Sequence, residues 1–385
     1  MHKPLYLDYN ATTPLDPGVR EAMLPFLGDA AFGNPSSIHH FGRETRAAVD
    51  DARDLVARTL RARPAEIIFT GGGTESDNLA LLGLARAHAS RGRHIITSRI
   101  EHHAVLHACQ YLENHCGFSV TYLNPSPTGR IDPAQLAAAL RPETVLVSIM
   151  SANNETGVLQ PVAEMAGICR AKGVLFHTDA IQSFGKQPVF PHDWGVDALS
   201  LAPHKFYGPK GTGILFLKFG LTLEPIHYGG YHEGDRRPGT ENVAGIVGAA
   251  AAVALAAKAD LETFQKRSFD LTEKLWTGLK NLPGIRRNGD PEKRLGNTLN
   301  VSFEGLDGEE LLMSMDLEGL CVSSGSACMV GSVQPSHVLM AMGVPEHVAK
   351  ATIRFSIGKS TTPEAIDHII TVTRSVVGRL AKTGR

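Results

Sequence analysis

The chain has 385 residues, of which 43% are hydrophobic and 20% are charged, and its formal net charge is −1 at pH 7. This length is too great for one small core and predicts a large domain joined to a smaller one. The near-zero charge excludes the broad basic face of a nucleic-acid-binding protein, so we expect no nucleic-acid partner. The N-terminus lacks the apolar core of a signal peptide.

The longest apolar tract lies near residue 250 and is shorter than the roughly 20 residues that a membrane span needs. We therefore expect a buried helix there and no membrane partner. Five cysteines, scattered over the chain, suit a reducing cytoplasm better than a disulfide framework. The adjacent His39 and His40 are poorly spaced for a shared metal, and we expect no metal site.

Helical and extended patterns alternate along the first half of the chain. We expect a helix at 16–27, with Pro17 at its first position. Further helices are expected at 39–60, 132–140 and 162–172, and one that begins at Glu101. Strands are expected at 66–70, 94–98, 119–123, 144–149, 174–176 and 197–201. This alternation predicts a largely parallel, doubly wound sheet. Farther on we expect helices at 243–282 and 306–315, strands at 297–303 and 352–356, and an amphipathic helix from Pro363.

A glycine-rich turn follows the strand at 66–70 and reads Gly71-Gly-Gly-Thr-Glu-Ser-Asp-Asn. A strand, a glycine turn and a helix start form a common phosphate site, because glycines allow close approach and free N–H groups face the anion. The turn lacks the Gly-Lys-Ser/Thr ending of a Walker loop and the spacing of a dinucleotide fingerprint. A glycine turn alone is weak evidence for a phosphate site.

A carboxylate and a lysine follow two neighbouring strands: Asp179 in HTDAIQ and Lys205 in PHKFYGPKGTG. Pyridoxal phosphate needs this pair, since a lysine forms its Schiff base and an acid keeps its ring nitrogen protonated. Single Asp and Lys residues at strand ends are more often surface or ion-pair residues. Here a glycine-rich turn and polar neighbours accompany them. Lys210 is the rival lysine, but it lies in a turn where its side chain would point to water or phosphate.

Four further positions carry polar or reactive groups whose ordinary roles compete with functional ones. A histidine after a strand (His102) is often an end cap, and two amides at a strand end (Asn153-Asn154) can form a turn. Arg354 is the only charge on its strand and needs a partner, for which a substrate α-carboxylate fits the planar guanidinium. Cys328 lies among Ser, Gly and Ala, as an accessible nucleophile would, and its thiolate must be favoured below the free-thiol pKa of roughly 8.5.

Six of these segments, in order, resemble the class V, fold-type I pyridoxal-phosphate enzymes, and more closely the cysteine desulfurases of the NifS/IscS type. The motifs are YLDYNATTP, GGTESDN, EHHAV, NNETG, HTDAIQ with PHKFYGPKG, and SSGSAC. The resemblance implies an α/β fold-type I transferase with a mainly parallel seven-stranded sheet and a smaller α/β domain. It places the large domain at 14–260 and the small domain at 1–13 and 261–385, with the cysteine loop in the small domain.

The resemblance also implies a role for each site residue. Lys205 would bind the cofactor and move the Cα proton, His102 would stack on the ring, and Cys328 would accept sulfur. The remaining cofactor contacts would come from Gly73, Thr74, Asn154, Asp179, Gln182 and His204, with Thr240 reaching the phosphate of a partner subunit. Asn10, Asn154 and Arg354 would bind the substrate.

The function that follows from the resemblance is conversion of L-cysteine to L-alanine, with sulfur left as a persulfide on Cys328. A homodimer and a sulfur-acceptor scaffold protein for iron–sulfur assembly are the implied partners. Selenocysteine lyase, another class V activity and a catalytically silent scaffold are the alternatives. The chain departs from the family at Ala202-Pro203, where Ser-Gly is common, and at Met329-Val330, where Thr-Ser is usual.

Overall fold

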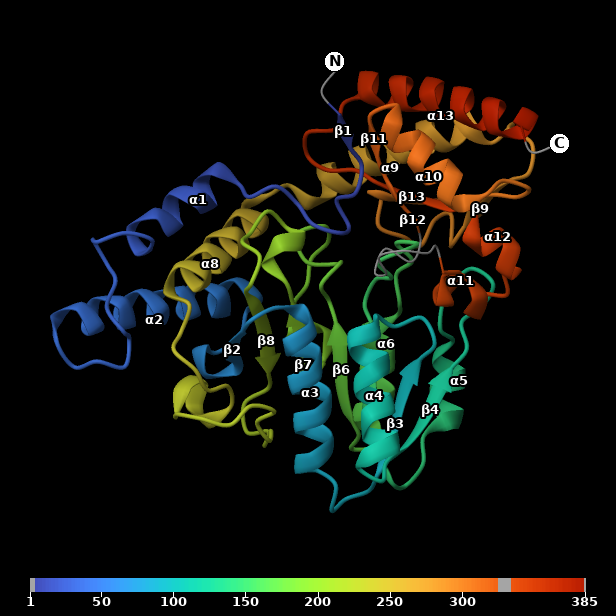
Figure 1. The fold of residues 1–385 in the computed structure, drawn as a ribbon. Helices are drawn as coiled ribbons and strands as arrows, with labels where there is room; N and C mark the ends of the chain where they lie inside the picture. The colour runs from blue at the N-terminus through green and yellow to red at the C-terminus, as the bar shows by residue number, and fades with distance from the viewer. Residues whose placement is uncertain (1–3, 325–333, 384–385) are drawn as a thin grey trace.

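The computed structural model describes residues 4–324 and 334–383, and its main element is a seven-stranded sheet (Figure 1). The strand order is β2–β8–β7–β6–β5–β3–β4, in which β8 is antiparallel to both neighbours and the other pairs are parallel. The strands are β2 (Ile67–Thr70), β3 (His94–Ser98), β4 (Ser119–Leu123), β5 (Thr144–Ser148), β6 (Leu175–Asp179), β7 (Ala198–Leu201) and β8 (Gly213–Leu217). The predicted, mainly parallel seven-stranded α/β fold is confirmed.

Helices cover both faces of this sheet because successive strand residues point to opposite sides. Ile68, Ile95 and Leu146 face a core built with α3 and α4, and Phe69 and Ile96 face the apolar layer on the opposite side of the same sheet. The first layer consists of α3 (Gly73–Ala87) and α4 (His103–His115); the second includes α2 (His40–Leu60), α6 (Val162–Ala171) and α8 (Val243–Lys258). Also present are α1 (Pro17–Met23), α5 (Pro133–Ala139) and α7 (Pro191–Trp194).

A second sheet, of four antiparallel strands, lies in the upper right of Figure 1. Its order is β12–β13–β10–β9, and its core is shared with α9, α10 and α13. The elements are α9 (Leu261–Leu279), β9 (Ile285–Asn288), β10 (Thr298–Phe303), α10 (Gly308–Leu317), β12 (Ser323–Ser324), α11 (His337–Ala341), α12 (Glu346–Lys350), β13 (Thr352–Ser356) and α13 (Pro363–Thr383).

The N-terminal segment belongs spatially to this second core. Strand β1 (Leu5–Tyr6) pairs in parallel with β11 (Leu320–Cys321), and Leu7 is buried among the residues of the second sheet. The division into 14–260 and 1–13 with 261–385 stays a prediction.

The prediction of one long helix over 243–282 is wrong. Two helices, α8 and α9, meet at an angle of 81°. The chain turns at Ala259, whose backbone is extended, and Asp260 then caps α9 by accepting a hydrogen bond from the backbone N–H of Thr263 at 3.0 Å. An aspartate is a preferred N-cap, so a new helix begins there.

Over the described ranges, no single helix has the length and apolarity to cross a membrane. The bent pair α8 and α9 meets these two criteria only when taken together.

Phe303 fills the centre of the second core, where its side chain is fully buried. We expect Phe303→Ala to lower the free energy of unfolding by about 3–5 kcal/mol, because it removes apolar contacts and leaves a cavity. Leu317→Ala is the control, since this α10 side chain is 86% exposed and its loss should change the free energy by less than about 0.5 kcal/mol. Chemical denaturation of both variants measures the difference, and equal effects would contradict the assigned core.

Candidate active site

The predicted site residues converge on a cavity of about 660 Å³ between the two sheets. Strand β6 ends at Asp179, and β7 is followed by a short 3₁₀ helix, Pro203–Lys205, that brings Lys205 to the same edge. This edge is where open α/β sheets bind ligands. The cavity lining includes ten of the predicted residues: Asn10, Gly73, Thr74, His102, Asn154, Asp179, Gln182, His204, Lys205 and, from β13, Arg354.

Asp179 presents a carboxyl group that is only 6% exposed. One of its oxygens accepts a hydrogen bond from the backbone N–H of Ile181 at 2.9 Å. Burial raises the pKa of Asp179 to about 6, against the opposing effect of that hydrogen bond and of the Lys205 cation. A buried acid at the cavity wall suits a cationic nitrogen in a ligand, since the pair would favour the ionised carboxylate.

Below Asp179, on the same face of β6, lies a polar row that sequence reasoning missed. His177 shares hydrogen bonds with the hydroxyls of Ser148 on β5 at 2.9 Å and Ser200 on β7 at 3.0 Å. Burial lowers the pKa of His177 to about 3, so its ring is neutral. Because side chains alternate along a strand, residues 177 and 179 of β6 lie on one face. This alternation could have predicted from the sequence that His177 lies on the same face as Asp179.

Lys205 is held by two backbone carbonyls of the N-terminal segment. Its Nζ donates to the carbonyl oxygens of Asn10 and Ala11, each at 2.8 Å. Lys210 lines a second cavity, of about 830 Å³, beside the glycine turn at 71–74. The two lysines therefore line different cavities: Lys205 lines the same cavity as Asp179, and Lys210 lines the cavity beside the glycine turn.

His102 faces the same cavity from the start of α4. As N-cap residue it accepts a hydrogen bond at Nδ1 from the backbone N–H of Ala104, at 3.1 Å. Nδ1 is thus the acceptor, and a neutral ring carries its proton on Nε2. Burial, with a smaller contribution from the Lys205 cation, lowers the pKa of His102 to about 4.

The glycine turn has the features of an anion site. Helix α3 starts at Gly73, and its N-cap residue Gly72 supplies no side-chain hydrogen bond to the first turn. At Gly73 a Cβ atom would lie 2.3 Å from Cδ1 of Ile181, so a larger residue would require the Ile181 side chain to move. The bare helix N-terminus, with Thr74 and Lys210 lining the adjoining cavity, suits a phosphate.

Gln182 is held by a buried amine that sequence reasoning did not identify. Lys186 donates from Nζ to the carbonyl oxygen of Gln182 at 2.9 Å and to its Oε1 at 3.0 Å, while Nε2 of Gln182 donates to the carbonyl of Asn10 at 2.9 Å. Burial, with smaller contributions from the Lys205 and Arg354 cations, lowers the pKa of Lys186 to about 7. The spacing of 182 and 186 gave no signal of this role.

Two predicted substrate residues are tied into the protein. Arg354 donates from Nη2 to Asp8 at 2.6 Å and from Nη1 to the carbonyl of Asn154 at 3.0 Å, while its buried Nε has no hydrogen-bond partner among the described atoms. Asn10 uses its side chain to bond Thr298, Asn297 and the carbonyl of Asn154. A substrate carboxylate at Arg354 would therefore meet Nε or compete with Asp8.

The departure at Ala202-Pro203 leaves an apolar side chain, Ala202, in the cavity wall. The neighbouring His204 shares a hydrogen bond with Thr12 at 3.1 Å, and burial with the nearby Lys205 cation lowers its pKa to about 4. In the cavity beside the glycine turn, the lining hydroxyls are those of Thr12, Thr74 and Thr212.

Two predicted residues do not line this cavity in the described structure. Thr240 is exposed on a loop and lines neither of the two cavities described above. Cys328 and the departure at Met329-Val330 lie outside the described residues. Cys321 is half-buried on β11, and burial raises the pKa of its thiol.

Together these groups fit pyridoxal phosphate. Asp179 would pair with the ring nitrogen, His102 would cover the ring, the helix start at Gly73 and Thr74 would hold the phosphate, and Lys205 would reach the aldehyde carbon.

No group of three or more His, Cys, Asp or Glu side chains within residues 4–324 and 334–383 is arranged to hold a metal ion.

The chain is similar to known proteins over nearly its whole length. The family model for aminotransferase class V matches residues 5–369. The chain is 46% identical to the cysteine desulfurase IscS of Dictyoglomus turgidum, covering 99% of this chain and 96% of that protein, and 47% identical to the cysteine desulfurase IscS of Klebsiella pneumoniae, covering 99% and 94%. Among solved structures, a NifS-like protein superposes with a TM-score of 0.90 at 38% identity, covering 98% of this chain and 99% of the other.

The lowered pKa of His102 is testable because the Lys205 cation contributes to it and Lys210 is not among its causes. In the cofactor-free protein we expect His102 to stay neutral until the pH falls to about 4. Lys205→Met should raise this pKa, because it removes a cation that disfavours the protonated ring. Lys210→Met is the control and should leave it unchanged. Ring-nitrogen NMR shifts followed against pH give the values, and an ordinary pKa in the unmodified protein would contradict the assigned burial.

Proposed function

Since this chain belongs to the class V aminotransferase family and is a pyridoxal-phosphate-dependent cysteine desulfurase, we propose that it converts L-cysteine to L-alanine and keeps the sulfur as a persulfide on Cys328. The observation that carries the proposal is the shared cavity of Asp179, Lys205 and His102. An acid, an amine and a neutral imidazole on one cavity wall are the groups that this chemistry requires.

The bound cofactor supplies an electron sink for the charge that forms at the substrate Cα. The residues of this chain hold and orient the reactants. Asp179 keeps a negative charge beside the ring nitrogen, and Arg354, with Asn154 beside it, receives the substrate α-carboxylate. Lys205 is the amine that takes the proton from Cα and later donates a proton to the product. Its hydrogen bonds to the carbonyls of Asn10 and Ala11 hold the free amine at the cavity.

The sulfur step joins two thiols and leaves a methyl group. The thiolate of Cys328 attacks the substrate sulfur, so a sulfur–sulfur bond forms as the Cβ–S bond breaks. The electron pair of the broken bond stays with Cβ, which gains a proton and becomes the methyl group of alanine. The transferred sulfur is oxidised and Cβ is reduced, so the step needs no external oxidant.

The nucleophile is tested by comparing two cysteines. We expect Cys328→Ala to keep cofactor binding and substrate binding but to lose persulfide formation and sulfide release under reductant, since Asp179, Lys205 and Arg354 are untouched. The control, Cys321→Ala, should keep both activities, because its half-buried thiol lies on β11 and has a raised pKa. Alanine and sulfide are measured from each variant. Stoichiometric sulfide from Cys328→Ala would show that another thiol accepts the sulfur.

A sulfur-acceptor scaffold protein for iron–sulfur assembly is the proposed destination of the persulfide. A relative's name, cysteine desulfurase IscS, supports this class of pathway. The four described cysteines are free thiols, which fits a reducing compartment such as the cytoplasm.

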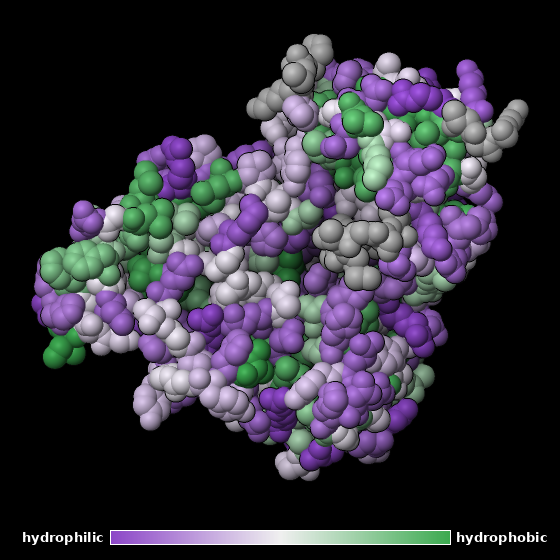
Figure 2. All heavy atoms as spheres, viewed as in Figure 1, coloured by the Kyte–Doolittle hydropathy of each residue, from purple (hydrophilic) through white to green (hydrophobic). Residues whose placement is uncertain are grey.

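We also propose a homodimer with composite sites. Several large apolar side chains are exposed around α1 and the start of α2, where Figure 2 shows apolar surface on the left of the molecule: Leu24, Leu27, Phe32, Ile38 and Phe41. Exposed apolar side chains gathered in one region favour a protein interface. Thr240 is exposed and lies away from its own cavities, as expected for a residue that contacts the phosphate of a partner subunit.

Mixed dimers test the composite site. A dimer of one Lys205→Ala subunit and one Thr240→Ala subunit has one intact site if Thr240 serves the partner, because the lysine of the second subunit meets the threonine of the first. We therefore expect activity to reappear when the two inactive homodimers are dissociated and mixed. Each homodimer alone is the control. Activity that stays absent in the verified heterodimer would mean that Thr240 acts within its own chain.

A further inference from the structure

The loop that carries Thr240 is fixed to its own subunit by ion pairs whose carboxylates are largely buried. We call residues 231–241 the arm. Near its start, Glu233 accepts hydrogen bonds from Nη1 and Nη2 of Arg53 on α2, each at 2.7 Å, and from the backbone N–H of Phe69 on β2 at 3.1 Å. The Glu233 side chain is 2% exposed. One carboxylate therefore joins the arm, a helix and the strand that leads into the phosphate loop.

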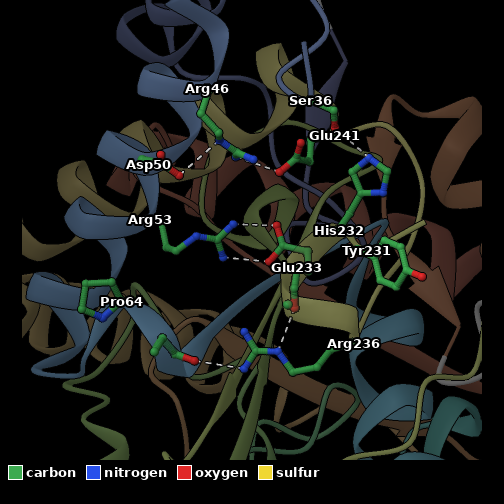
Figure 3. Close-up of a pocket in the computed structure, with 12 residues that line it drawn as sticks. Ser36, Arg46, Asp50, Arg53, Pro64, Tyr231, His232, Glu233, Arg236 and Glu241 are labelled. Atoms are coloured by element: carbon green, nitrogen blue, oxygen red, sulfur yellow. Dashed lines mark hydrogen bonds and ion pairs between the residues drawn. The ribbon is translucent and has the colours of Figure 1, made fainter. Parts of the chain in front are cut away.

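The backbone of the arm adopts a costly conformation at this anchor. Glu233 has φ 50°, Gly234 has φ 63° and Asp235 has φ 64°, so two residues with side chains lie in the left-handed region. Such residues persist only where surrounding contacts hold them. Arg236 supplies such contacts, since it donates from Nε to the carbonyl of Glu233 at 2.8 Å and from Nη1 to the carbonyl of Ala65 at 3.0 Å (Figure 3).

Two further ion pairs flank Thr240 in the chain. Before it, Arg237 donates to both oxygens of Glu75, at 2.7 and 3.2 Å, and Glu75 also accepts from the backbone N–H of Gly71 at 2.7 Å. After it, Glu241 lies 2.7 Å from Nη2 of Arg46, as Figure 3 shows. Both contacts reach elements of the same subunit, α3 and α2.

From these contacts we propose that the arm is a rigid, preformed element and that Glu233 is its positioning residue, which sets where Thr240 is presented to the cofactor phosphate of the partner subunit. The inference rests on the proposed role of Thr240 between subunits. Glu233 itself touches neither cofactor nor substrate.

The chemistry of the anchor favours positioning over simple stabilisation. A buried carboxylate and guanidinium lose hydration, so apolar side chains of similar volume would hold the arm down at least as well. The planar guanidinium instead fixes direction through two parallel bonds. The same carboxylate also binds β2, so the register between the arm and the phosphate loop is set at one atom, Oε2 of Glu233.

A test follows from placing one substitution in either subunit of the mixed dimer described above. Glu233→Gln is first combined with Lys205→Ala, so that it alters the arm serving the intact site. It is then combined with Thr240→Ala, so that it lies in the chain whose own phosphate loop belongs to the intact site. The cofactor dissociation constant of the intact site is measured by spectroscopic titration, together with amide hydrogen exchange of 229–242.

We expect the first arrangement to weaken cofactor binding by about tenfold or more, since a misplaced contact has a large cost, and the second to change it less than about twofold. Equal weakening in both arrangements, or weakening only in the second, would overturn the inference, because Glu233 would then act through folding or through its own phosphate loop. A mixed dimer without Glu233→Gln that shows no intact site would instead contradict the composite site.

Two further variants separate positioning from stability. Arg53→Lys keeps the charge but loses the paired bonds, and it should repeat the effect of Glu233→Gln if that variant folds poorly. Glu273→Gln is the control, because Glu273 is likewise a glutamate paired with arginine, to Arg287 at 2.5 Å and Arg294 at 2.7 Å, but lies in α9, outside the arm. It should lower stability while leaving the cofactor dissociation constant unchanged. A change in that constant equal to the change in Glu233→Gln would contradict the inference.

Discussion

The burial of the Asp179 carboxyl at the end of β6 is the constraint on which the site depends. A carboxyl group that loses hydration favours its neutral form unless a cation compensates it, and here burial dominates over the Lys205 cation. A cationic ligand group beside Asp179, such as the protonated ring nitrogen of the proposed arrangement, would favour the ionised carboxylate. Because the sheet fixes Asp179 and the 3₁₀ helix after β7 fixes Lys205, the acid and the amine hold a set separation before any ligand arrives.

The neighbouring groups are arranged so that few of them carry charge. Burial lowers the pKa values of His102, His204 and Lys186 to about 4, 4 and 7, and raises that of Glu101 to about 8. Neutral imidazoles and a partly neutral amine leave the cations of Lys205 and Arg354 as the principal positive groups of the cavity. In the proposed arrangement a substrate α-carboxylate would meet the fixed charge of Arg354, and the neutral groups of the wall would contribute hydrogen bonds and shape.

Sequence predicted most of what is local and little of what is distant. Strands such as β4 and β13 follow from short alternating or apolar runs, and the glycine turn announces the start of α3 within a few residues. The break at Ala259 was missed because an alanine-rich helix runs into a second helical pattern, so that periodicity hides the new cap at Asp260. Contacts between remote segments gave no local signal: Asp8 and Arg354 are 346 residues apart, and Gln182 reaches Asn10 across 172. The ion pair between Asp8 and Arg354 is therefore visible only in the three-dimensional structure.

Ion pairs have two different roles in this chain: one joins a helix to a turn in the smaller domain region, and the others fix the arm to its own subunit. In the smaller domain region, Arg294 is nearly fully buried and bonds Glu273, Thr272 and three backbone carbonyls at 2.9, 3.2 and 3.4 Å. This guanidinium therefore joins α9 to the turn before β10. In the arm the same chemistry joins a loop with left-handed residues to a rigid sheet, where an apolar anchor would allow the loop to slide. Buried ion pairs add little net stability over apolar packing, but their bonds have direction. In its proposed role, a loop that presents the Thr240 hydroxyl to a partner subunit has more need of direction than of stability, and this would account for charged anchors on both sides of Thr240.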